Sequence, residues 1–217
     1  MLYLGHRSFK IPHRNIEQQK NARESGNMQK QRQKMGTVKI IGGKWKTRKV
    51  LFRDSPGLRP TLARTRETLF NWLRPYILDS HCLDLFAGSG ALGFEALSQG
   101  ASFLTCVDNN LTSINDITKQ AALFETGITA VHGDSVAFLR GTSEAFDIIF
   151  IDPPYSQEKL FDDVLSIITK KNLAGKFLYI ETSDIRYLNE IENKFPLKIH
   201  RTSKSGQSHF SIVIPKI

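Results

Sequence analysis

The sequence predicts an α/β protein with one seven-stranded, mostly parallel sheet that is covered by helices on both faces. Short apolar runs alternate with helical stretches after Asp79, as is typical of parallel strands buried on both sides. The last two apolar runs flank a Ser205-Gly206 turn, which predicts an antiparallel hairpin at the C-terminal end. With 217 residues, 40% hydrophobic and 24% charged, the chain is long enough for a sizeable core, and its composition excludes the disordered and disulfide-rich classes.

The chain is expected to begin with an arm that precedes the folded domain. Residues 1–36 are rich in Gln, Asn, Lys and Arg and show no sustained apolar period, so we expect them to be mostly disordered. Residues 37–217 then form one domain. Because the patterned sequence begins only after Met35, we hypothesise that translation starts at Met28 or Met35.

A basic hairpin is predicted over residues 37–58, with strands at Val38–Ile41 and Val50–Phe52 and a turn at Gly42-Gly43. Pro60-Thr61 then opens a helix. Its apolar face is expected to contain Leu69, Phe70, Leu73, Tyr76 and Ile77.

The alternating part supplies the main sheet. Parallel strands are expected at Cys82–Phe86, Phe103–Val107, Ile128–His132, Phe146–Ile151 and Phe177–Glu181. The helices between and after them are expected at 91–99, 111–124, 135–140, 157–171 and 184–193. The closing hairpin is expected at Leu197–Ser203 and Ser208–Ile214.

The charge of the chain is strongly polarised. Residues 1–66 carry 17 basic and 3 acidic side chains, whereas the remainder carries 13 and 18. A basic front end on a mildly acidic globule indicates a polyanionic partner, either nucleic acid or an anionic membrane surface. The alternative is a solvated, lysine-rich tail.

Targeting signals and metal sites are not expected. No apolar run approaches the roughly 18–20 residues that span a bilayer, and Met1–Lys10 lacks a hydrophobic signal segment, so we expect a cytoplasmic protein. Cys82 and Cys106 each lie inside an apolar run. This placement argues against a disulfide framework and against a cysteine zinc site, and it suits a reducing compartment.

A glycine-rich turn after the first strand predicts a nucleotide cofactor. Gly88, Gly90 and Gly93 match G-x-G-x-x-G, and Asp108 follows Gly88 by 20 residues at the end of the next strand, where an acid accepts hydrogen bonds from ribose hydroxyls. Dinucleotides and S-adenosylmethionine share this geometry. A tight turn without a ligand is the alternative.

Two further acids distinguish these cofactors. Asp84 lies near the end of the first strand, where it can face a cationic cofactor, and Asp134-Ser135 follows the third strand, where an adenine amino group would lie. Either acid can instead cap a helix. Together with Asp108 they predict an acid-lined crevice that suits a sulfonium cation better than a pyrophosphate.

The segment Asp152-Pro153-Pro154-Tyr155, directly after the fourth strand, predicts the chemistry. Two prolines fix φ and remove two N–H donors, so the Asp152 carboxylate and the Pro153 carbonyl form a rigid acceptor array for an exocyclic amino group. Tyr155 would stack on the base. In-line methyl transfer would develop positive charge on the amino nitrogen, where these acceptors stabilise it.

At these residues the sequence resembles class I S-adenosylmethionine-dependent methyltransferases that modify amino groups. Four motifs in order resemble more specifically the bacterial 16S ribosomal RNA guanine-N2 methyltransferase family: Ile40-Ile41-Gly42-Gly43-Lys44-Trp45, Arg59-Pro60-Thr61, Arg64–Leu73 and Leu83–Gly93. The resemblance implies a Rossmann-like fold, a monomer, and methylation of guanine 966 in the assembling small subunit. It places the cofactor at Phe86, Gly88, Ser89, Gly90, Asp108, Asp134 and Ser135, and catalysis at Asp152, Pro153, Pro154 and Tyr155. Asn109-Asn110 departs from the family, which often has a basic residue after the acid.

The basic hairpin is expected to bind RNA phosphates. The residues assigned to this contact are Lys44, Trp45, Lys46, Arg48, Lys49, Arg59 and Arg64. Trp45 either stacks on RNA or fills the core, and Arg64 and Arg66 either meet phosphate or pair with Glu67 and nearby acids.

Three other functions remain open from the sequence. An adenine-N6 DNA methyltransferase would use the same Asp-Pro-Pro-Tyr loop. A dinucleotide-dependent oxidoreductase would explain the glycine turn but not that loop, and a non-catalytic RNA-binding assembly factor would explain only the basic front end.

Overall fold

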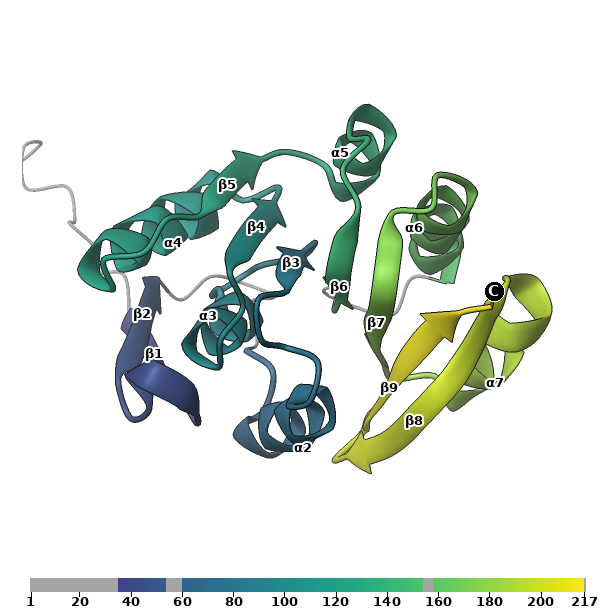
Figure 1. Ribbon diagram of the computed structural model, residues 1–217, viewed down its shortest axis with the longest axis horizontal. Coiled ribbons are helices and arrows are strands. Elements are labelled where there is room, and N and C mark those ends of the chain that lie inside the picture. Colours follow the sequence, from purple (N-terminus) through teal and green to yellow (C-terminus); the bar gives the residue numbers. More distant parts are fainter. Residues whose placement is uncertain (1–34, 54–59, 154–157, 217) are drawn as a thin grey trace, which may run out of the picture. The chain divides into compact units, whose positions relative to one another are not determined.

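The computed structural model describes residues 35–53, 60–153 and 158–216 (Figure 1). Its strands are β1 (Met35–Lys39), β2 (Lys49–Arg53), β3 (His81–Asp84), β4 (Phe103–Asp108), β5 (Thr129–His132), β6 (Phe146–Ile151), β7 (Ala174–Thr182), β8 (Leu197–Ser205) and β9 (Ser208–Pro215). Its helices are the 3₁₀ turn η1 (Gly43–Trp45) and α2 (Ala63–Leu73), α3 (Ala91–Ser98), α4 (Leu111–Leu123), α5 (Ser135–Gly141), α6 (Glu158–Lys170) and α7 (Ile185–Lys194). Within this described part, no helix is both long and apolar enough to cross a membrane.

The predicted N-terminal arm lies outside the described residues, except that Met35 and Gly36 belong to β1. The domain boundary placed at residue 37 therefore falls inside a strand. The start-site hypothesis stays a prediction.

Seven strands form one sheet in the order β5-β4-β3-β6-β7-β9-β8, and this confirms the predicted fold class. The pairs from β5 to β7 are parallel, whereas β9 runs antiparallel to both β7 and β8. The chain runs outward from β3 to β5 and then returns to the other side of β3 with β6. Ligands bind beside such a switch point, outside the carboxyl ends of the strands.

Both faces of the sheet are covered because its strands are apolar on both sides. Cys82 and Ile148 pack into a cluster with α2, α3 and α4, whereas the adjacent Leu83 and Ile149 pack into a second cluster with α5, α6 and α7. Since successive side chains of a strand point to opposite faces, these two clusters are the two layers that the apolar runs predicted.

The helix α2 is shorter than predicted. Pro60 and Thr61 precede it without being helical, and it ends at Leu73, so Tyr76 and Ile77 lie beyond it. Pro75 has no N–H to continue the helical hydrogen bonds, which explains the early end. Ile77 is nevertheless buried, whereas Tyr76 is exposed.

The N-terminal hairpin forms a separate two-stranded sheet, with Val38 opposite Val50. It lies beside α3 and α4 (Figure 1). At its open end, Arg53 forms an ion pair with Asp116 of α4 at 2.8 Å. At its turn, the Trp45 N–H donates to the Ser98 hydroxyl at the last residue of α3, at 2.9 Å.

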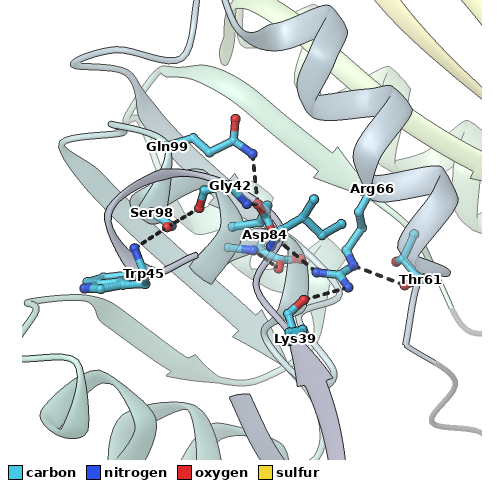
Figure 2. A network of polar contacts seen from close by, with 11 residues as sticks. Lys39, Gly42, Trp45, Thr61, Arg66, Asp84, Ser98 and Gln99 are labelled. Carbon is cyan, nitrogen blue, oxygen red and sulfur yellow. Dashed lines mark hydrogen bonds and ion pairs between the residues drawn. The ribbon is translucent and has the colours of Figure 1, made fainter. Parts of the chain in front are cut away.

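A buried carboxylate attaches this hairpin to the rest of the domain. Glu95 of α3 accepts the N–H groups of Ile41 at 2.9 Å and Gly42 at 2.8 Å, and it pairs with Arg66 of α2 at 3.2 Å. Figure 2 shows Arg66 also reaching the backbone of Lys39 and Thr61. The side chains of Arg66 and Glu95 are only 3% and 0% exposed, so this network joins α2, α3 and the hairpin away from water.

The turn of the hairpin requires glycine at Gly43. Its φ is +73°, a region that disfavours side chains, and a Cβ there would lie 1.7 Å from the Ser98 carbonyl oxygen. The close approach of the two backbones is therefore possible only for glycine.

We expect Glu95→Ala to lower the free energy of unfolding by about 3–5 kcal/mol, because it leaves the Arg66 charge buried without its partner. Urea unfolding monitored by circular dichroism measures this change. The matched control is Glu67→Ala on the exposed side of α2, for which we expect a change within about 0.5 kcal/mol. Equal stability losses in the two variants would contradict the role of Glu95.

Candidate active site

A cleft of about 1200 Å³ lies at the carboxyl ends of the parallel strands. It is lined after β3 by Asp84 to Ser89, after β4 by Asp108 to Asn110, after β5 by Gly133 to Ser135, and after β6 by Asp152 and Pro153. The cleft is also lined by Pro60 to Leu62, Ala91, Leu92, Ser113, Glu181 to Ser183 and Ser205 to Ser208. The predicted cofactor residues thus share one cleft, with the exception of Gly90.

Gly90 shapes the turn without lining the cleft. Its φ is +75° where it precedes α3, and its N–H donates to the Ala87 carbonyl at 2.6 Å. The left-handed conformation explains the glycine at this position.

Asp108 holds the glycine turn from the neighbouring strand. One carboxylate oxygen accepts the Gly88 N–H at 2.7 Å and the other accepts the Asn110 N–H at 2.7 Å. Each oxygen keeps a second lone pair for ribose hydroxyls. The ends of β3 and β4 are thereby fixed relative to each other.

Asp84 is buried beneath the same turn. Its carboxylate accepts the Gly93 N–H at 3.2 Å. A Cβ at Gly93 would lie 2.7 Å from a methyl group of Leu104, so a side chain there would displace Leu104. Burial raises the pKa of Asp84 to about 7, although the Gly93 N–H opposes the shift. The carboxyl group is thus close to its midpoint of ionisation at neutral pH.

The negative charge around this turn favours a cationic cofactor over a pyrophosphate. In a dinucleotide site the pyrophosphate binds at the N-terminus of the helix that follows the turn. Here the Asp84 carboxylate already accepts an N–H from the first turn of α3, and a phosphate beside it would meet like charge. A sulfonium would meet an opposite charge from Asp84.

Asp134 caps α5, as the helix-cap interpretation predicted. One of its carboxylate oxygens accepts the Ala137 N–H at 2.8 Å. Because Asp134 also lines the cleft next to Ser135, its remaining acceptor capacity is available to a ligand.

Asp152 follows β6, the strand next to β3, and lines the same cleft. The Thr61 hydroxyl donates to its carboxylate at 2.8 Å. Loss of water contact, the Glu181 carboxylate and, more weakly, the Asp84 carboxylate raise the pKa of Asp152 well above its usual range. Pro153 is buried beside it, whereas the predicted residues Pro154 and Tyr155 lie outside the described residues.

Known proteins are similar to this chain in sequence and in fold. A family model described as "Conserved hypothetical protein 95" matches residues 38–214. Ribosomal RNA small subunit methyltransferase D of Escherichia coli K12 is 39% identical over 180 residues, which cover 79% of this chain and 87% of that relative. The chain belongs to the ribosomal RNA small subunit methyltransferase D family.

Two further relatives agree with that assignment. The Haemophilus influenzae protein of the same description is 39% identical over 75% of this chain and 88% of its own length. The solved structure of the putative methyltransferase yhhF from Escherichia coli superposes with a TM-score of 0.75 at 33% identity, covering 83% of this chain and 99% of that one. The family resemblance drawn from the four motifs is confirmed.

Several cleft residues were absent from the sequence prediction. Thr61 belongs to one of the family-like motifs but had no assigned role. Glu181 ends the fifth apolar run, as Asp84 lies near the end of the first. Ser205 to Ser208 reach the cleft from the β8–β9 turn. The position of Glu181 at a strand end was the only sequence signal that could have identified it.

The structure corrects the predicted stacking role of Trp45. Its side chain is 7% exposed, and its ring lies 4.6 Å from that of Phe124. A buried ring has no face free for a base, so Trp45 is the core residue of the alternative interpretation. Arg66 is likewise buried and pairs with Glu95, not with Glu67 or phosphate.

The other predicted RNA-binding residues that the structure describes are exposed, but most of them lie away from the cleft. The segment from η1 to the start of β2 lies at the C-terminal ends of α3 and α4. We call its exposed basic residues the basic loop: Lys44, Lys46, Arg48 and Lys49. The cleft lies at the other ends of these helices, and α3 alone separates the two regions by about 12 Å. Arg64 is exposed on α2, and Arg59 lies outside the described residues.

We expect the affinity for S-adenosylmethionine to rise about tenfold between pH 6 and pH 8. Below pH 7 the Asp84 carboxyl is mostly protonated and must release its proton to face a cation, so binding strengthens as the pH passes the pKa. Calorimetric titration at several pH values measures this. S-adenosylhomocysteine, which lacks the charge, should show a weaker dependence. A slope that persists in Asp84→Asn would exclude Asp84 as its source.

Proposed function

We propose that this protein transfers a methyl group from S-adenosylmethionine to the N2 amine of guanine 966 in 16S ribosomal RNA. The observation that carries the proposal is the shared cleft. It brings the Asp152 carboxylate, held by Thr61, together with the acid-lined glycine turn in a chain of the ribosomal RNA methyltransferase D family.

Each acid of the cleft would contact a different part of the cofactor. S-adenosylmethionine, when bound, supplies a methyl group activated by its sulfonium charge. Asp108 would accept from the ribose hydroxyls, Asp134 from the adenine amino group, and Asp84 would compensate the positive charge. Phe86, Gly88, Ser89 and Ser135 line the same part of the cleft.

Asp152 and Pro153 would act on the acceptor nitrogen. The lone pair of a guanine amino group is delocalised into the ring, which makes the nitrogen a poor nucleophile. Hydrogen bonds from its two hydrogens to the Asp152 carboxylate and the Pro153 carbonyl return electron density to it and stabilise the charge that develops. The raised pKa of Asp152 also makes it a stronger base for the proton that the alkylated nitrogen releases.

The substrate is the 16S RNA of the assembling small subunit, and the protein acts on it as a cytoplasmic monomer. A guanine in a hairpin loop costs less to extrude into the cleft than one in a duplex. Arg64 and the basic loop would hold phosphates outside the cleft. Since the basic loop lies at the far end of α3, it would contact RNA remote from the target base.

The competing functions account for fewer of these features. An adenine-N6 methyltransferase would use the same acceptor array but lacks support from the family. An oxidoreductase would place a pyrophosphate against the Asp84 carboxylate. A non-catalytic assembly factor leaves the Asp152–Thr61 arrangement without a purpose.

We expect the protein to place labelled methyl groups on guanine 966 of small subunits reconstituted from unmodified RNA. We expect Asp152→Asn to reduce the rate at least 100-fold, because the amide carries no charge to stabilise the nitrogen, while calorimetry shows unchanged cofactor binding. Nucleoside mass spectrometry identifies the product and its position.

The control for this experiment is Asp163→Asn, an exposed acid on α6, which should retain full activity. Label on adenine, or on DNA alone, would refute the proposed substrate. Loss of both turnover and cofactor binding in Asp152→Asn would show that Asp152 is a structural residue.

We expect replacement of Lys44, Lys46 and Lys49 by glutamine to weaken RNA binding and to reduce the slope of log affinity against log salt by about 2–3, since each phosphate contact releases counterions. Filter binding at several salt concentrations measures the slope. Lys159 and Lys170, which are exposed on α6, provide a control variant. An equal slope in the wild type and the triple variant would remove the basic loop from the RNA interface.

A further inference from the structure

A second carboxylate, Glu181, lies beside Asp152 in the cleft and contacts no substrate atom in the mechanism above. The strands β6 and β7 are parallel neighbours, with Ile151 opposite Ile180. Asp152 and Glu181 are therefore the next residues along each strand, and both line the cleft. The carboxylates are close enough for Glu181 to act on the pKa of Asp152.

Two hydroxyl groups fix the orientation of Glu181. The Tyr179 hydroxyl donates to one carboxylate oxygen at 2.5 Å, and the Ser208 hydroxyl donates to the other at 2.5 Å. Tyr179 is fully buried, and its ring packs near those of Phe150 and Phe210. A carboxylate has about four acceptor sites, so each oxygen of this pre-oriented acid retains one for a ligand.

A pair of carboxylates offers acceptors only, and this restricts the base that can face them. The Watson–Crick edge of guanine presents two adjacent donors, the N2 amine and N1–H. The corresponding edge of adenine presents one donor, the N6 amine, beside an N1 lone pair. A base that placed an N1 lone pair against a carboxylate would lose a hydrogen bond and meet negative charge.

We propose that Glu181 accepts the N1–H of the guanine whose N2 amine is held by Asp152, and that Glu181 thereby selects guanine over purines with an unprotonated N1. This inference rests on the proposed function. In it, Asp152 accepts a hydrogen bond from the reacting N2 amine and Glu181 accepts one from N1–H. Tyr179 and Ser208 hold Glu181 in position.

Glu181 could otherwise serve only as the hydrogen-bond partner of Tyr179 and Ser208 that joins β7 to β9. The two roles predict different behaviour. A structural acid affects all substrates equally, whereas an acid that reads N1–H affects the ratio between substrates that differ at N1.

The test uses two RNAs that carry guanine or 2-aminopurine at the target position. Both bases present the reacting N2 amine, but N1 of 2-aminopurine is an acceptor. We expect the wild-type protein to favour guanine in kcat/KM by roughly 10- to 100-fold. We expect Glu181→Gln to reduce the preference for guanine at least fivefold, because the amide keeps one acceptor oxygen in place of two and gains an NH2 group that can donate to N1 of 2-aminopurine.

A second variant tests the positioning of Glu181. Tyr179→Phe preserves the buried ring and leaves the acid in place but removes one of its two donors, so the preference should fall by a smaller factor. Asp163→Asn is the matched loss of an exposed acid and should leave both rates unchanged. Thermal melting and cofactor affinity confirm that each variant is folded.

The outcomes separate this inference from the proposed function. If the wild-type protein does not methylate guanine, the proposed function fails. If it methylates guanine and Glu181→Gln slows both RNAs by the same factor, Glu181 is structural and the inference alone is overturned. A preference that stays at the wild-type value in both Glu181→Gln and Tyr179→Phe also overturns it.

Discussion

The ion pair between Glu95 and Arg66 is the constraint on which the site depends. Glu95 lies at the C-terminal part of α3, the helix whose N-terminus forms the cofactor turn. Arg66 lies on α2 and donates through Nε to the Thr61 carbonyl at 3.3 Å, and the Thr61 hydroxyl donates to Asp152. One chain of contacts therefore runs from the hairpin through α3 and α2 to the acid expected to hold the reacting nitrogen. Figure 2 shows the part of this chain from Gly42 to Thr61.

A buried ion pair is stabilising only when its partners satisfy one another fully. Here each Glu95 oxygen accepts two donors: Gly42 N–H and the Gln99 amide on one, Ile41 N–H and Arg66 on the other. Apolar substitutes could fill the same volume, but they could not orient two backbone N–H groups of the hairpin. The network thus specifies one geometry of the hairpin on the domain and satisfies backbone groups that would otherwise be buried without partners.

Within the described residues, the acids of the cleft and the lysines of the basic loop lie apart from one another. The acids line the cleft, where burial and neighbouring carboxylates raise the pKa values of Asp84 and Asp152, so ionising these acids together costs free energy. A cation and the donor edge of a base would each relieve that cost. The exposed lysines of the basic loop lie at the other end of α3, where they do not neutralise these acids. Phosphate binding and methyl transfer can therefore use opposite charges in one small domain.

The sequence predicted the strands and helices that depend on local pattern, including β6 at its observed bounds. It did not predict contacts between residues that lie far apart in the chain. Thr61 and Asp152 are 91 positions apart, and nothing local to either indicates their hydrogen bond. The role of Trp45 was ambiguous because a tryptophan between lysines suits an RNA contact and a core position equally. Its packing on Phe124, which follows α4 far along the chain, decides for the core. Glu95 did leave a signal: it is the one charge in an eight-residue helix whose residues are all buried. A carboxylate in such a helix must have internal donors, and the sequence could reveal that need without revealing that the hairpin and Arg66 supply them.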